Sequence, residues 1–136
     1  LNLLGEREQS QYGSTTFNEL KANCLKKIDE LKMSAEFFQS NIEGEIISKI
    51  QEARKDFDGI IINAAGFTHT SVAIRDALDV FKKPIIEVHI SNIFKREEFR
   101  HKSLISDVVS GGIFGLGLEG YILAIISIEK MFKNES

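Results

Sequence analysis

Two short apolar runs constrain the fold of this chain more than any other feature. Residues 59–62 form a compact β-branched run, and residues 85–90 form a second one, interrupted only by Glu87 and His89. Such runs are typical of strands that are buried on both faces of a sheet. A helical pattern at Val72–Phe81 lies between them. A strand, a helix and a second strand in this order predict a parallel βαβ unit.

The same alternation continues along the rest of the chain. Apolar residues at helical spacing predict further helices over three ranges, and two further strands are expected. The helices are 17–31, 43–57 and 119–132, and the strands are 35–39 and 108–116. This order predicts an α/β three-layer sandwich, with a parallel β-sheet and helices on both faces. No repeat or linker divides the chain, so we expect a single domain over residues 1–136.

Length and composition narrow the class of protein. The 136 residues are 43% hydrophobic with a net charge of −3, so charge alone predicts no binding to nucleic acid or membrane. The longest apolar run, residues 121–128, is too short to span a bilayer. Cys24 is the only cysteine, which rules out an internal disulfide and fits a reducing, cytoplasmic compartment. Since no strand precedes Leu1, we expect residues to be missing at the front.

Polar residues gather where the predicted strands end, and ligands of parallel sheets bind at that edge. Asn63 ends one strand, and Glu87, His89 and Ser91 alternate along the next, so these three share a face. A carboxylate raises the pKa of a neighbouring imidazole and fixes its tautomer, which suits a general acid. A structural ion pair is the alternative.

The loop after Asn63 leads into the start of a helix through His69, Thr70 and Ser71, and Asp76 follows within that helix. Such a place can hold the hydroxyl or carboxylate groups of a ligand. Thr70 or Ser71 could instead only cap the helix, and Asp76 could be a solvated charge.

Two further segments carry arginines. Residues 5–13 contain Arg7 and Tyr12 between two glycines, and a guanidinium can lower the high pKa of a phenol. Arg96 and Arg100 would share a face if their segment is helical, and arginine can grip a carboxylate. The alternatives are a disordered surface loop and a surface charge cluster.

Taken together, these segments resemble the type II 3-dehydroquinate dehydratases, also called type II dehydroquinases. The matching stretches occur in register over nearly the whole chain. They are residues 1–8, 12–13, 37–45, 63–71, 86–92 and 96–100.

The resemblance implies a flavodoxin-like fold assembled as a homododecamer, a tetramer of trimers, that works without metal, cofactor or Schiff base. It implies a cytoplasmic lyase of the shikimate pathway of aromatic amino acid biosynthesis, or of quinate use. The reaction would convert 3-dehydroquinate into 3-dehydroshikimate through an enolate.

The resemblance also implies catalytic roles. Tyr12 would remove a proton from C2, and Arg7 would keep its phenol acidic and help to hold the enolate charge. His89 would protonate the departing C1 hydroxyl, oriented by Glu87. The remaining site residues would bind the substrate. These are Ile90 and Ser91 for its carboxylate, Asn63, His69 and Arg100 for its hydroxyls, and Asp76 reaching the site of a neighbouring subunit.

Departures from the family pattern leave alternatives open. The family usually carries a strand and Gly-Pro-Asn before the position of Leu1, and the Asn that positions a water cannot be assigned here. A non-enzymatic flavodoxin-like binding module or a structural subunit is the main alternative. A receiver domain would need aspartate at Asn63. His69, His89 and His101 lack the spacing of metal ligands.

Overall fold

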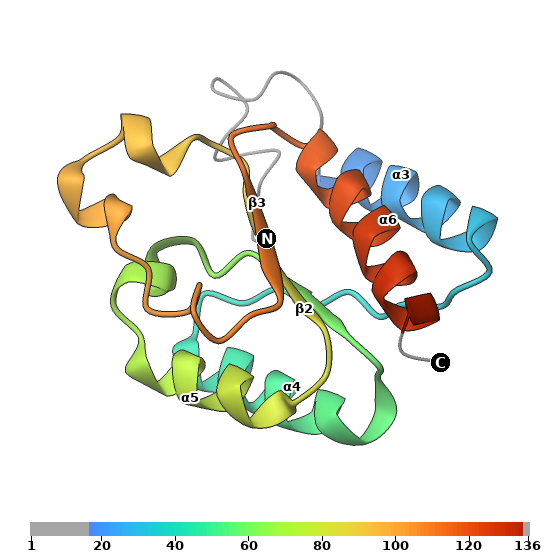
Figure 1. Cartoon of the computed structure of the whole chain (residues 1–136), viewed down its shortest axis with the longest axis horizontal. Helices are drawn as coiled ribbons and strands as arrows, with labels where there is room; N and C mark the ends of the chain where they lie inside the picture. The colour runs from blue at the N-terminus through green and yellow to red at the C-terminus, as the bar shows by residue number, and fades with distance from the viewer. Residues whose placement is uncertain (1–16, 135–136) are drawn as a thin grey trace.

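The structure, a computed structural model, describes residues 17–134 and arranges them in three layers (Figure 1). Its central sheet has three described parallel strands in the order β1-β2-β3, with helices α3 and α6 on one face and α4 and α5 on the other. The strands are β1 (Ile60–Ile62), β2 (Ile85–His89) and β3 (Gly111–Phe114). The helices are α3 (Phe17–Glu30), α4 (Glu43–Asp56), α5 (Val72–Phe81) and α6 (Glu119–Asn134). The predicted α/β sandwich is confirmed.

The two faces of β2 meet different surroundings. Ile86 and Val88 belong to the apolar cluster that joins the sheet to α3 and α6. Ile85 belongs to the second cluster, with residues of α4 and α5. Because side chains alternate along a strand, Glu87 and His89 share the face of Ile85. The predicted pair of titratable residues therefore points away from α3 and α6.

Helices α3 and α6 lie side by side and pack through a shared apolar stripe (Figure 1). Leu20, Cys24 and Ile28 are four residues apart, so they fall on one face of α3, and all three are buried. They join Tyr121 and Ile125 of α6 in one cluster. Cys24, with 3% of its surface exposed, thus serves as a small core residue, as the sequence predicts.

Helix α5 begins and ends where the sequence predicts. The side chain of Ser71 accepts a hydrogen bond from the backbone N–H of Ile74 at 2.9 Å, which caps the first turn. Lys82 ends the helix in the left-handed conformation, with φ of 61°. Pro84 follows and cannot continue a helix. Ser71 therefore has the structural role that was the alternative to ligand binding.

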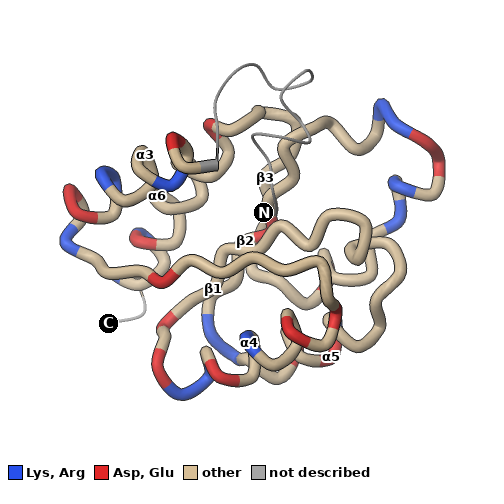
Figure 2. The backbone as a smooth tube through the Cα atoms, turned by 180° about the vertical axis from the view of Figure 1, so that it is seen from behind, with Lys and Arg blue, Asp and Glu red and all other residues tan. Residues whose placement is uncertain are grey.

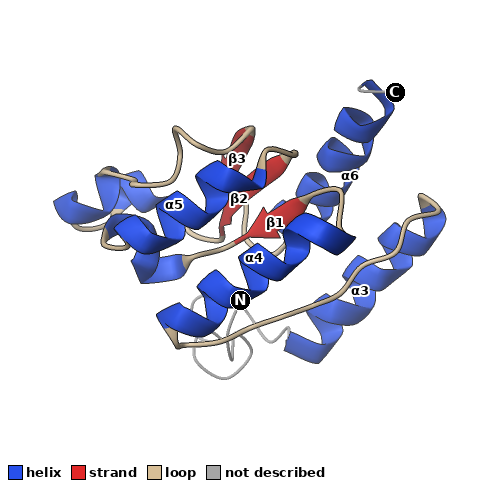
Figure 3. Cartoon of the chain, turned by 90° about the horizontal axis from the view of Figure 1, so that it is seen from below, coloured by secondary structure: helices blue, strands red, loops and turns tan. Residues whose placement is uncertain are grey.

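Two predicted strands differ from the structure. Residues 35–39 form no strand, because no described segment pairs with them, and they run as a loop between α3 and α4 (Figure 3). β3 is shorter than the predicted 108–116, because residues before it form a turn closed by the bond from Val108 N to Ile105 O at 3.0 Å. An apolar run favours an extended chain, whereas a strand also needs a neighbour.

Candidate active site

The carboxyl ends of β1 and β2 meet at one edge of the sheet. In the pairing of β1 with β2, Ile62 lies opposite Glu87. In the pairing of β2 with β3, His89 lies opposite Phe114. Asn63 therefore follows β1 at the same edge at which His89 ends β2. The edge carries the polar residues that the sequence places there.

Glu87 and His89 form a buried hydrogen-bonded pair. Their side chains are 4% and 8% exposed, and Nε2 of His89 contacts Oε2 of Glu87. An ionised carboxylate only accepts hydrogen bonds, so the ring nitrogen Nε2 carries the proton. The predicted contact between Glu87 and His89 is confirmed. It holds a proton on Nε2 of His89, so Nδ1 is the ring nitrogen that remains for another partner.

The second oxygen of Glu87 has a partner that sequence reasoning missed. Ser106, in the segment before β3, donates from Oγ to Oε1 of Glu87 at 2.6 Å. Burial of the Glu87 carboxyl alone raises its pKa, but the hydrogen bonds from His89 and Ser106 and the charges of His89 and His69 lower it below its ordinary value. Glu87 is therefore held as a carboxylate.

This ionisation predicts a pH-dependent contribution to stability. The pKa of Glu87 is lower in the folded chain than in the unfolded chain, where a glutamate has a pKa of about 4.3. Ionised Glu87 therefore contributes to the free energy of unfolding above this pH. The contribution is lost as the pH falls through the pKa of the folded state. We expect Glu87→Gln to lower the free energy of unfolding at pH 7 by about 1–3 kcal/mol. The difference should shrink below about pH 4. Urea unfolding at both pH values measures this.

The exposed Glu98→Gln is the matched control for that prediction and should change the free energy of unfolding little at either pH. A Glu87→Gln difference that stays the same from pH 7 to pH 3 would contradict the ionised pair.

A cavity of about 480 Å³ opens beside the pair. Glu87 and His89 line it, together with residues of β3 and two aromatic side chains, Phe94 and His101. Phe94 is in ring contact with both His101 and Phe114, with centroids 5.6 and 5.2 Å apart. The cavity thus has a buried acid–base pair on one wall and an aromatic cluster on another.

Asn63 and His69 are held by their own partners near the same edge. Asn63 donates from Nδ2 to Oη of Tyr121 at 2.8 Å and accepts from the backbone of Ala65 at 3.0 Å. His69 donates from Nδ1 to the carbonyl of Lys102 at 2.8 Å, since a carbonyl can only accept. These bonds fix both side chains. Within residues 17–134, the second N–H of Asn63 and Nε2 of His69 have no further hydrogen bond.

The other predicted binding residues are less closely gathered. Ile90 is buried in the cluster with α3 and α6, on the opposite face from His89. Ser91 accepts a long hydrogen bond, 3.5 Å, from Nη1 of Arg96. Asp76 lies exposed on α5. None of these three side chains lines the cavity, and neither do Asn63, His69 and Arg100. Of the predicted site residues in the described part of the chain, only Glu87 and His89 line it.

Arg100 lies in a charged loop rather than on an α-helix. Arg96 ends one 3₁₀ helix and Arg100 belongs to the next, so the condition for a shared helical face is not met. Arg100 forms an ion pair with Glu97 and lies 4.9 Å from the ring centroid of Phe99. Figure 2 shows a negative stretch between positive ones along this loop. Arg7 and Tyr12, by contrast, lie outside the described residues.

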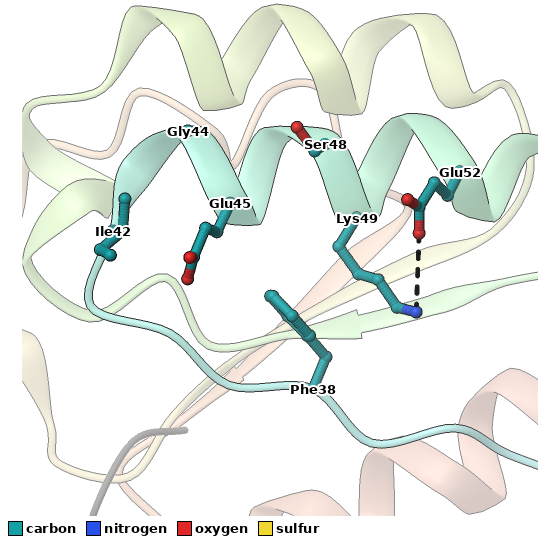
Figure 4. Close-up of a pocket in the computed structure, with 7 residues that line it drawn as sticks. All are labelled: Phe38, Ile42, Gly44, Glu45, Ser48, Lys49 and Glu52. Atoms are coloured by element: carbon teal, nitrogen blue, oxygen red, sulfur yellow. Dashed lines mark ion pairs between the residues drawn. The ribbon is translucent and has the colours of Figure 1, made fainter.

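A second hollow, of about 580 Å³, lies on α4 and the loop before it (Figure 4). Phe38 and Ile42 provide its apolar wall, and Lys49 and Glu52 form an ion pair of 3.7 Å along the helix. It contains none of the predicted site residues. We therefore place the candidate site at the sheet edge and not here.

Comparison with known proteins decides the family. The sequence profile described as "Dehydroquinase class II" matches residues 1–129. The chain belongs to the class II dehydroquinases. The resemblance on which the site residues were predicted is thereby confirmed.

Individual class II dehydroquinases match over most of the chain. A 3-dehydroquinate dehydratase of Campylobacter jejuni is 53% identical over 128 residues, which cover 94% of this chain and 80% of that one. One of Sulfurovum sp. is 50% identical over 131 residues, covering 96% and 81%. The crystal structure of a type II dehydroquinase from Butyrivibrio crossotus is 47% identical with a TM-score of 0.90, covering 94% and 90%. These likenesses confirm the flavodoxin-like fold and the enzyme class.

Two features are absent from the described residues, 17–134. No group of three or more described His, Cys, Asp or Glu side chains is placed to hold a metal ion. No described helix is long and apolar enough to cross a membrane.

Proposed function

We propose that this chain converts 3-dehydroquinate into 3-dehydroshikimate by anti elimination through an enolate, with Tyr12 as base and His89 as acid. Dehydration of 3-dehydroquinate in the shikimate pathway follows from membership of the class II dehydroquinases. The assignment of the two proton transfers is our own. The observation that carries it is the buried Glu87–His89 pair at the wall of the cavity.

The acid half of the reaction uses His89. Loss of a hydroxyl from C1 needs a proton donor, because hydroxide is a poor leaving group. The carboxylate of Glu87 accepts from Nε2 and stabilises the imidazolium, so the proton to be transferred is the one on Nδ1. After the transfer the neutral ring keeps its bond to Glu87, and its orientation does not change.

The base half uses Tyr12. Removal of a proton next to the ketone leaves negative charge on the carbonyl oxygen, so the reaction needs both a base and a group that stabilises charge. A phenol has a reference pKa of about 10, and a guanidinium beside it favours the phenolate. Arg7 supplies that group and also helps to hold the enolate.

Residues at the sheet edge would hold the ring of the substrate. Asn63 has a second N–H beyond the one given to Tyr121, and the Nε2 atom of His69 is its remaining ring nitrogen. Arg100 would turn its guanidinium from Glu97 to a hydroxyl of the substrate. The carboxylate of the substrate would bind around Ile90 and Ser91.

The direct test is an ultraviolet assay with purified protein and 3-dehydroquinate. The product is a conjugated enone that absorbs ultraviolet light, whereas the substrate has no such conjugated group. We expect steady formation of the enone. Binding of 3-dehydroquinate without any absorbance change would favour a non-enzymatic binding module instead.

We further propose a cytoplasmic homododecamer, a tetramer of trimers, in which Asp76 reaches the site of a neighbouring subunit. The proposed reach of Asp76 is supported by its exposed position on α5 and by its absence from the residues that line the cavity of its own chain.

Mixing variants tests the shared site. The variants Asp76→Ala and Tyr12→Phe should each have low activity alone. Mixed oligomers should regain part of the activity, because some sites then combine Tyr12 of one subunit with Asp76 of its neighbour. Light scattering verifies the assembly, and the ultraviolet assay measures the recovery. Unrecovered activity in verified mixed oligomers would assign Asp76 to its own chain or to no catalytic role.

A further inference from the structure

The carboxylate of Glu87 is held at both oxygens. Oε2 accepts from His89, and Oε1 accepts from the hydroxyl of Ser106 at 2.6 Å. The Glu87 side chain is 4% exposed, so bulk water has little access to either oxygen. The residue that completes the pair is thus a serine 19 positions further along the chain.

One hydrogen bond does not fix a carboxylate. The last torsion of a glutamate side chain is broad and roughly two-fold, so the carboxylate can turn about the bond to its carbon stem. A second partner on the other oxygen defines its plane. Because Oε2 of Glu87 contacts Nε2 of His89, the plane of this carboxylate is coupled to the orientation of the His89 ring.

The Ser106 hydroxyl can act as a fixed point, because its segment is anchored. Ser103 accepts hydrogen bonds from the backbone N–H groups of Ile105 and Ser106, at 3.1 and 3.0 Å. The side chain of Ile105 is fully buried in the cluster with α4 and α5. The turn that carries Ser106 is therefore held both by hydrogen bonds to Ser103 and by the buried side chain of Ile105.

Two hydrogen bonds to the backbone of Leu104 tie the same segment to the loop that carries His69 and to α5. The N–H of Leu104 donates to the carbonyl of Thr68 at 2.8 Å. Arg75 of α5 donates to the carbonyl of Leu104 at 2.8 Å and forms an ion pair with Asp107. Although Ser106 lies in an exposed segment, its position relative to β2 is defined by α5 and by the loop after β1.

We propose that Ser106 is a positioning residue for the dehydration: its hydroxyl holds the carboxylate of Glu87 in the plane that orients His89. This rests on the proposed role of His89 as acid. Ser106 contacts neither the substrate nor the transferred proton, and it acts only through Glu87.

The test compares Ser106→Ala with Ser106→Thr, which keeps the hydroxyl. We expect Ser106→Ala to lower kcat roughly ten- to a hundredfold with KM little changed, as for loss of one hydrogen bond to a charged group. Ser106→Thr should restore most of the rate. Equal losses in both variants, or an unchanged kcat in Ser106→Ala, would overturn the proposal.

A double-mutant cycle with Glu87→Ala shows whether Ser106 acts through Glu87, because alanine has no oxygen to accept from the serine. If Ser106 acts only through Glu87, adding Ser106→Ala to Glu87→Ala should cost no further activity. A full additional loss in the double variant would mean that Ser106 acts on another group.

A readout without turnover separates this proposal from the proposed function. The chain has three histidines, so the ring ¹H–¹⁵N signals of His89 can be assigned by substitution and followed by NMR. The Nε2–H signal should be sharp in the wild type and in Ser106→Thr, and shifted or broadened in Ser106→Ala. If the wild type forms no enone, the dehydration proposal fails. An unchanged signal in Ser106→Ala overturns the positioning role in either case.

Discussion

Replacement of His89 by asparagine should lower kcat for dehydration by roughly two to four orders of magnitude, the usual contribution of a general acid. Asparagine is polar and can keep a hydrogen bond to Glu87, but it cannot give a proton to the leaving hydroxyl. The face of β2 that carries His89 otherwise presents Ile85 and the carboxylate of Glu87, so this face holds no second imidazole. Stopped-flow absorbance of the enone measures the single-turnover rate.

His101→Asn is the matched control for this prediction. His101 lines the same cavity, but it is exposed, with a hydrogen bond of 3.2 Å to the carbonyl of Arg96 and a ring contact to Phe94. Its replacement should leave most of the activity. A His89→Asn enzyme as fast as the His101→Asn enzyme would remove His89 from the mechanism.

Tyr12→Phe should reduce turnover by at least about a thousandfold while substrate binding is kept. The substitution removes only the phenolic oxygen, which is the group proposed to take the proton from C2. The aromatic ring stays and can still cover the substrate. Isothermal titration with 3-dehydroquinate measures binding, and the ultraviolet assay measures turnover on the same sample.

Substrate deuterated at C2 gives the second half of the Tyr12 experiment. If Tyr12 is the base, the Tyr12→Phe variant should exchange this deuterium with water more slowly than the wild type does, in parallel with its loss of turnover. Exchange at the wild-type rate would instead assign proton removal to another group and leave Tyr12 with a binding role.

The fold could be predicted as far as local signals reach. Helix α5 has its predicted ends because Ser71 caps it and Lys82 with Pro84 stops it, all within a few residues. The segment 35–39 was predicted wrongly as a strand, because a strand depends on a neighbour that local sequence does not specify. Parallel pairing of β1 with β2 followed from their order along the chain.

The candidate site was predictable where spacing alone brings groups together. Glu87 and His89 are two apart on one strand, so their contact follows from the strand period. Ser106 and the partner of Asn63, Tyr121, come from segments 19 and 58 positions away. No periodicity relates residues across such loops, and only the packed structure brings them together.

The burial of Cys24 between α3 and α6 provides a chemical reporter of motion. Burial raises the pKa of its thiol to about 11, so at neutral pH almost no reactive thiolate exists. A thiol reagent can therefore modify the chain only after α3 separates from α6, and no second cysteine competes for it. The modification rate measures how often this layer of the protein opens, and its slowing by a bound ligand would show that the distant helix pair senses occupancy.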